Sequence, residues 1–211
     1  MFCKIVPEND CLDVGAADRF AWYKGEGRGE TQKEMESRIT HSWLEENLPK
    51  EEVKKLLTLL DGRKSPTAEE LLAHIAEHDA APLVDLLYPR FPQLFLKSRK
   101  YSFYAIRFSN LCLPPFPPEV LQSCLLAQNG QLSAACLFAL TGAVGALEAL
   151  LEYGVDPHGL DTPESWSYIN LPNGHILPVA PLDCALLTDD ENCLLTLSMF
   201  GGESIHSNAP T

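Results

Sequence analysis

The sequence predicts an all-α fold in which a solenoid of helical hairpins follows an irregular N-terminal arm. Apolar residues recur at helical spacing along most of the chain, as in residues 53–60. Gly and Pro separate these segments where a chain of hairpins needs its turns. An apolar content of 45% is enough for a continuous core in 211 residues. We expect an arm over 1–30, a helical region over 31–113 and the clearest hairpins over 114–211.

Helix signals begin after the arm. Thr31 can cap a first helix, and Pro49 stands at the first-turn position of a second one. Thr67 and Glu70 have the spacing of a capping box, which predicts a third helix that begins after Thr67. The segment Pro82–Tyr88 adds a short helix, so the last two helices are expected to form a hairpin.

Residues 89–118 form a proline-rich joint between the two helical parts. Within it, the aromatic stretch Tyr101–Leu111 fits either a helix or a strand. Proline ends a helix because it lacks an amide hydrogen and restricts the residue before it. We expect a new helix to start at Pro117 or Pro118 and to end near Asn129-Gly130.

The helical pattern is clearest from Leu132 onward. Leu132–Leu140 is rich in alanine, which predicts a helix that neighbouring hairpins approach closely. The turn Thr141-Gly142-Ala143 leads to a second helix, Val144–Tyr153, with leucines on one face. Gly154 stands where a left-handed residue ends a helix. The pair therefore predicts a helical hairpin.

This stretch resembles the ankyrin repeat family. The matching positions are Ala139, Gly142, Leu150-Leu151, Gly154 and Asp156, and a second copy runs from Pro181-Leu182-Asp183-Cys184-Ala185 to Gly201-Gly202. The resemblance covers residues 132–202 best. The sequence departs from the family pattern at Ala180 and Asp183, and the segment between the copies is longer than the family's. The resemblance implies a stack of helical hairpins that binds other proteins.

The charge distribution is uneven. The formal net charge is −13, from 16 Lys and Arg against 29 Asp and Glu. Arg107 is the last basic residue, and residues 108–211 hold eleven acidic residues without a single Lys or Arg. Such a surface repels phosphates, so we do not expect a nucleic acid partner. It attracts a basic protein at long range, although acidity can also serve solubility alone.

The leading hypothesis is therefore a protein-interaction module that binds a basic protein and is not an enzyme. A narrower form is a bacterial immunity or antitoxin-type inhibitor, by analogy with small acidic proteins that neutralise basic toxins. The candidate contacts are acidic, aromatic and imidazole side chains after the first copy and in the second: Asp156, Asp161, Glu164, Trp166, Tyr168, His175, Asp189, Asp190 and Glu191. The alternative is that Trp166 and Tyr168 fold back over the core.

Catalytic and metal-binding signals are weak. None of the seven cysteines forms a C-x-x-C pair, and most lie in apolar segments where a buried thiol is inert. His74 and His78 are four residues apart, but Ile75 stands where an H-E-x-x-H site requires Glu. We expect no cofactor and no metal. The rival hypothesis is a secreted bacterial effector with an N-terminal activity and an ankyrin-like targeting region.

The N-terminus has no apolar stretch long enough for a signal peptide. The longest apolar run, Ala134–Leu147, is interrupted by Thr141, Gly142 and Gly145 and is too short for a membrane span. We therefore expect a cytoplasmic protein that does not contact a membrane. Export by a signal-independent route stays open.

Overall fold

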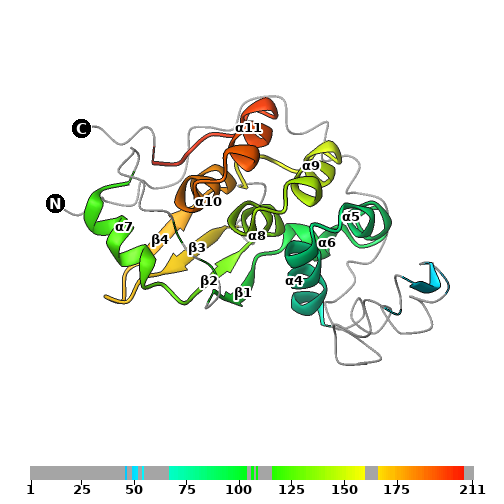
Figure 1. Ribbon diagram of the computed structural model, residues 1–211, viewed down its shortest axis with the longest axis horizontal. Helices are drawn as coiled ribbons and strands as arrows, with labels where there is room; N and C mark the ends of the chain where they lie inside the picture. The colour runs from blue at the N-terminus through cyan, green and yellow to red at the C-terminus, as the bar shows by residue number, and fades with distance from the viewer. Residues whose placement is uncertain are drawn as a thin grey trace, which may run out of the picture.

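The computed structural model describes residues 46, 49–51, 54, 67–103, 106, 108, 116–159 and 166–206. The longer described segments hold eight helices: α4 (Ala68–His78), α5 (Ala81–Leu87), α6 (Pro92–Leu96), α7 (Pro118–Leu125), α8 (Ala134–Thr141), α9 (Val144–Glu152), α10 (Pro181–Thr188) and α11 (Glu191–Met199) (Figure 1). They also hold four strands: β1 (Arg99–Ser102), β2 (Asn129–Leu132), β3 (Ser167–Asn170) and β4 (Ile176–Val179). The predicted arm and first two helices fall almost wholly outside the described residues.

The prediction of an all-α solenoid is wrong. The four strands form one antiparallel sheet in the order β1-β2-β3-β4, so the fold mixes helix and sheet. The helical-solenoid architecture that the ankyrin resemblance implies is therefore wrong as well. Asn129-Gly130, expected at the end of a helix, instead begins β2. Gly130 suits this place because a Cβ there would lie 2.5 Å from the carbonyl oxygen of Tyr168 on β3.

The helices form three hairpins that pack in a row. They are α4–α5, α8–α9 and α10–α11, and α8 packs between α4 and α10 while α9 packs between α5 and α11 (Figure 1). The sheet adjoins the first helices, since β1 contacts α4, β2 contacts α8 and β4 contacts α10. Every residue of α8 from Ala134 to Leu140 is buried, so this small-residue helix lies at the centre of the core.

The three hairpins share one turn geometry. Asp79, Gly142 and Asp189 each end a first helix in the left-handed conformation, with φ of 47°, 74° and 55°. In each turn the next N–H donates to a carbonyl five residues back: Ala80 to Ile75, Ala143 to Phe138 and Asp190 to Ala185, at 2.9–3.1 Å. Such bonds satisfy carbonyls that a helix end would otherwise leave unpaired.

Several local predictions are confirmed. Thr67 and Glu70 form the predicted capping box at the start of α4. The helices expected over Leu132–Leu140 and Val144–Tyr153 correspond to α8 and α9. The ambiguous stretch from Tyr101 begins within β1.

Candidate functional site

The predicted contacts Asp189, Asp190 and Glu191 lie together at the turn between α10 and α11. Asp189 is the left-handed residue of this turn, and its side chain is exposed. Asp190 caps α11, since its Oδ1 accepts a hydrogen bond from the N–H of Cys193 at 2.8 Å. Glu191 is exposed in the first turn of α11. The exposed carboxylates of Asp189 and Glu191 therefore flank the Asp190 carboxylate, which caps α11.

The turns of the other two hairpins lie beside these residues and add a further acid, Asp79. Asp190 Oδ2 lies 2.8 Å from where a Cβ on Gly142 would stand, so the α10–α11 turn lies against the α8–α9 turn. On the other side, the Asp79 carboxylate accepts hydrogen bonds from the N–H groups of Gly145 and Ala146. We call Asp79, Gly142, Asp189, Asp190 and Glu191 the turn edge. It is an acidic border along the three hairpins.

The other predicted contacts lie elsewhere. Trp166 directly precedes β3 and its side chain is 61% exposed. Tyr168 is half-buried on β3, where its hydroxyl donates to Gln131 Oε1 at 3.2 Å. His175 is exposed in the turn between β3 and β4, at the opposite end of β3 from Trp166. The predicted aromatic and acidic contacts therefore do not form one surface.

Asp156 has a local structural role. Its Oδ1 accepts a hydrogen bond from the N–H of His158 at 3.0 Å, which stabilises the turn after α9. Asp161 and Glu164 lie outside the described residues.

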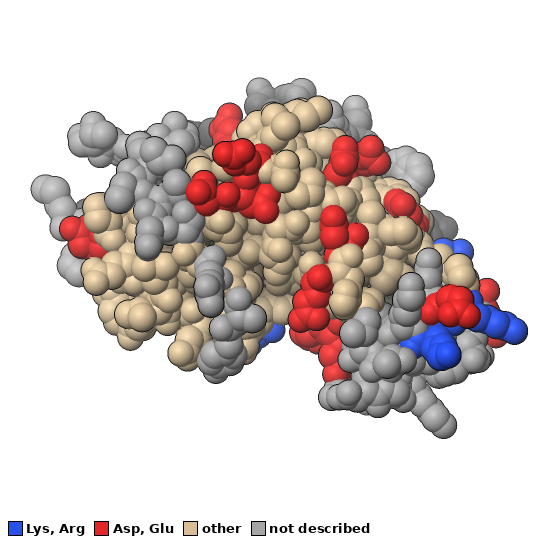
Figure 2. Space-filling model, in the orientation of Figure 1, with Lys and Arg blue, Asp and Glu red and all other residues tan. Residues whose placement is uncertain are grey.

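Acidic side chains are frequent on the face of the molecule that Figure 2 shows. Figure 2 shows red side chains spread over the region of α9, α10 and α11 and along α4, whereas blue side chains show only at the right-hand end and at one spot on the lower edge. Within the described residues 116–206, Asp183 is buried, and the other acids are Glu119, Glu148, Glu152, Asp156, Asp189, Asp190, Glu191 and Glu203. No Lys or Arg occurs in this part of the chain to offset them.

Asp183 forms a buried network that the sequence did not suggest. Its side chain is completely buried in the first turn of α10. The carboxylate accepts hydrogen bonds from the N–H of Ala180 at 2.8 Å, from the Ser204 hydroxyl and from the N–H of Ile205 at 3.4 Å. Burial raises the pKa of Asp183, and the surrounding donors oppose that effect. Asp183 thus anchors the segment after α11.

The same segment also contacts the sheet and α7. His206 Nε2 lies 2.8 Å from the carbonyl oxygen of Pro178 on β4, and its ring stacks at a tilt on Phe116, with ring centroids 5.0 Å apart. Because a carbonyl can only accept, this imidazole nitrogen carries a proton and donates it. Residues 204–206 therefore join β4, α10 and Phe116, which precedes α7.

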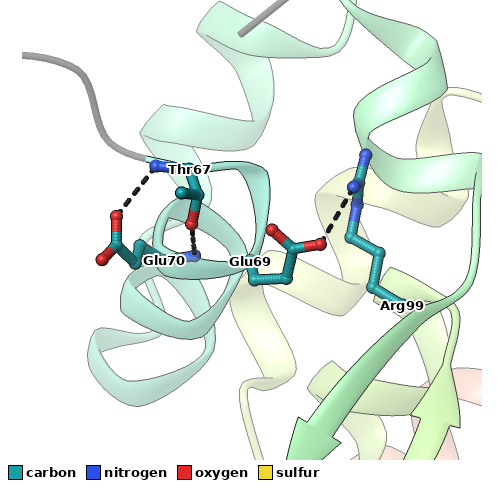
Figure 3. Close-up of polar contacts among 4 residues, drawn as sticks. All are labelled: Thr67, Glu69, Glu70 and Arg99. Atoms are coloured by element: carbon teal, nitrogen blue, oxygen red, sulfur yellow. Dashed lines mark hydrogen bonds and ion pairs between the residues drawn. The ribbon is translucent and has the colours of Figure 1, made fainter. Parts of the chain in front are cut away.

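A second polar cluster, with Arg99 buried and Glu69 partly exposed, lies between α4 and β1. Figure 3 shows the Glu69 carboxylate directed toward the guanidinium of Arg99, with 3.3 Å between Glu69 Oε1 and the nearest guanidinium nitrogen, beside the Thr67–Glu70 capping box. The Arg99 side chain is 3% exposed, and its Nε has no hydrogen-bond partner. The hydroxyl of Tyr101 is also buried without a partner, and its burial raises the Tyr101 pKa. No local sequence signal pairs Arg99 with Glu69.

The described part holds four buried cysteines and a pair of neighbouring histidines. Cys124, Cys136, Cys184 and Cys193 are free and buried, as their apolar segments predicted. Burial raises the pKa of Cys124 to about 11 and that of Cys193 to about 12, which leaves little reactive thiolate. The rings of His74 and His78 lie close together, with centroids 4.5 Å apart. The pKa of His74 is lowered, mainly by its burial and to a smaller extent by the charge of His78.

The described residues contain no group of three or more His, Cys, Asp or Glu side chains placed to hold a metal. None of the described helices has the length and apolar content needed to cross a bilayer.

In comparisons with known proteins, no family model, no curated protein and no solved structure matches this chain.

Proposed function

We propose that this chain binds a basic protein through the acidic face that carries the turn edge. One observation carries the proposal: residues 108–211 contain eleven acidic residues and no Lys or Arg. Clefts or faces of one charge sign raise the encounter rate with an opposite charge, and they discriminate against partners of the same sign. An acidic surface this uniform favours a cationic partner over a neutral or acidic one.

The placement of the acids supports the proposal. If acidity served solubility alone, the acidic residues would need no particular placement. Instead Asp189 and Glu191 are exposed at one turn, and Glu148 and Glu152 are exposed four residues apart on α9, which packs beside α11. A residue pair four apart lies on one side of a helix, so the two carboxylates of α9 face the same way.

Binding of the basic partner should weaken steeply with salt. The full chain would be immobilised, and proteins captured from its source organism would be identified and remade for titration. We expect a partner with a pI above about 9, whose Kd rises as salt increases from about 50 to about 200 mM because the Debye length shortens. A captured partner that is acidic, or a Kd that is independent of salt, would contradict the proposal.

A matched pair of variants separates local charge from total charge. Asp189→Asn/Glu191→Gln removes two charges from the turn edge, whereas Glu46→Gln/Glu51→Gln removes two exposed charges from residues that precede α4. Only the first pair should weaken binding and reduce its salt dependence. Equal effects would mean that net charge, and not this face, attracts the partner. If the partner is an enzyme, its activity in the complex shows whether the chain acts as an inhibitor.

A further inference from the structure

Helix α11 carries an exposed apolar stripe on the side away from the core. Leu195 is 63% exposed and Met199 is 76% exposed, and Phe200 directly after the helix is 38% exposed. Leu195 and Met199 are four residues apart, so they lie in one row along the helix. On the opposite side, Cys193 and Leu197 are completely buried. The helix is therefore apolar on two sides, and only one of them packs against the protein.

Acidic residues border this stripe, and no basic residue occurs nearby in the sequence. Glu191 is four residues before Leu195 and thus continues the same row at the N-terminal end, next to exposed Asp189. Glu203 is exposed just after the C-terminal end of α11. Helix α9 packs against α11 and adds the exposed Glu148 and Glu152. The surface therefore combines an apolar centre with an anionic border.

We propose that this surface of α11 binds a cationic amphipathic helix of the partner, and the proposal rests on the basic-partner function above. The apolar side of such a helix would cover Leu195, Met199 and Phe200, while its Lys and Arg side chains would reach Glu191 and Glu203. Helices that bind in this way use apolar anchors at spacings of three and four residues, which matches the row on α11. Long basic side chains also reach past an apolar contact to charges at its border.

The border charges favour this occupant over a second copy of the chain. Two copies joined through α11 would bring the acidic borders of both stripes together, and like charges across an interface oppose association. A basic helix meets the same charges with the opposite sign. Charge complementarity and the apolar row therefore select the same partner.

Two synthetic probes and the full-length chain test the proposal by fluorescence anisotropy. One probe is a helical peptide of leucine and lysine with one apolar side, and the other is an unstructured oligolysine of equal charge. We expect the amphipathic peptide to bind at least about 10-fold more tightly, because it also buries Leu195 and Met199. Leu195→Gln/Met199→Gln should remove that preference and leave oligolysine binding unchanged.

Control variants address general effects of polarity and folding. Leu125→Gln/Leu126→Gln changes two other exposed leucines, on and just after α7, and should leave both affinities unchanged. Circular dichroism and thermal melting of each variant report whether it folds. If a glutamine variant of α11 were unfolded, Met199→Ser alone would provide the same comparison, because its side chain is the most exposed of the stripe.

The remaining outcomes distinguish this inference from the proposed function. Equal binding of both probes, unaffected by Leu195→Gln/Met199→Gln, overturns the α11 surface and leaves the basic-partner function standing. Failure of both probes to bind at low salt contradicts both the α11 surface and the basic-partner function. Sedimentation velocity of the chain alone provides a third result: a dimer that Leu195→Gln/Met199→Gln dissociates would show that a second copy occupies the stripe, which also overturns the inference.

Discussion

The Asp79 carboxylate accepts a hydrogen bond from the N–H of Ala146 at 2.7 Å, although the two residues are 67 positions apart. The same carboxylate accepts from Gly145. Helix α9 begins after Ala143, which has no side chain to cap it, so Asp79 from the preceding hairpin supplies the missing acceptor. One hairpin thus caps the next.

Replacing Asp79 should destabilise the protein more than an ordinary surface change. Asp79→Ala removes both acceptors and leaves an alanine in a left-handed conformation, so we expect a loss of about 2 kcal/mol in the free energy of unfolding. Asp79→Asn should lose less, because Asn tolerates this backbone and keeps one oxygen. Urea unfolding measures the free energy of unfolding of both Asp79 variants. Glu77→Ala, an exposed change two residues earlier, serves as control, and a loss equal to that of Asp79→Ala would contradict the capping role.

Two glycines with nearly equal backbone angles should respond differently to alanine. Gly142 has φ of +74° and Gly154 has φ of +82°, so Gly→Ala costs about 1 kcal/mol of backbone strain at either position. At Gly142 the new methyl group would also lie 2.8 Å from Asp190 Oδ2, whereas nothing lies within 4 Å at Gly154. Gly142→Ala should therefore be the more destabilising in thermal unfolding. Equal losses would show that the turn edge adapts freely.

The buried Asp183 should make stability depend on pH. Its pKa is raised in the folded state above the usual value of 3.8, so the folded protein binds a proton more tightly than the unfolded chain does. Its contribution to stability is therefore present at low pH and is lost as pH rises through the folded pKa. Asp183→Asn removes this ionisation.

Urea unfolding of both proteins at several pH values from about 3 to about 8 isolates this contribution, because the other titrating groups are common to both. The stability of Asp183→Asn relative to the original protein should increase as pH rises. A difference that falls with pH would mean that the donors from Ala180, Ser204 and Ile205 outweigh the cost of burial.

The same tyrosine-to-phenylalanine change should have different effects on β1 and on β3. The Tyr101 hydroxyl is buried without a partner, so Tyr101→Phe removes an unpaired polar group and should leave stability equal or raise it by about 1 kcal/mol. The Tyr168 hydroxyl donates to Gln131, so Tyr168→Phe should lower stability by about 0.5–1 kcal/mol. The denaturant midpoints of both variants measure these changes in stability. A clear loss of stability for Tyr101→Phe would reveal a partner for that hydroxyl.

Helices were predictable where their ends carry local signals. The capping box of Thr67 and Glu70, the glycine of the α8–α9 turn and the proline that begins α10 each act within a few residues. The strands were missed because each is four residues long, too short for a clear alternation of apolar and polar residues. The sequence predicts a helix end at Gly130 because nothing nearby in the sequence indicates the contact of this residue with β3.

The candidate site likewise combines features that the local sequence predicts with features that only the fold reveals. The acids at the α10–α11 turn were predictable from the sequence, because charge and turn position are local properties. The bond between Asp183 and Ser204 spans 21 residues, and the ion pair between Arg99 and Glu69 spans 30. Such pairs form only once the chain has folded, so no spacing rule identifies them. The exposure of Leu195 and Met199 likewise depends on which side of α11 packs against the core.

The contact between His206 and Pro178 has a consequence for association with other chains. Strand β4 lies at the edge of the described sheet, where unpaired backbone groups commonly recruit a strand from another molecule. At its third position Pro178 has no N–H to offer, and its carbonyl already accepts a hydrogen bond from the imidazole of His206. An incoming strand would find neither donor nor free acceptor there. At this position, therefore, β4 cannot extend the backbone hydrogen bonds of the sheet to a strand from another molecule.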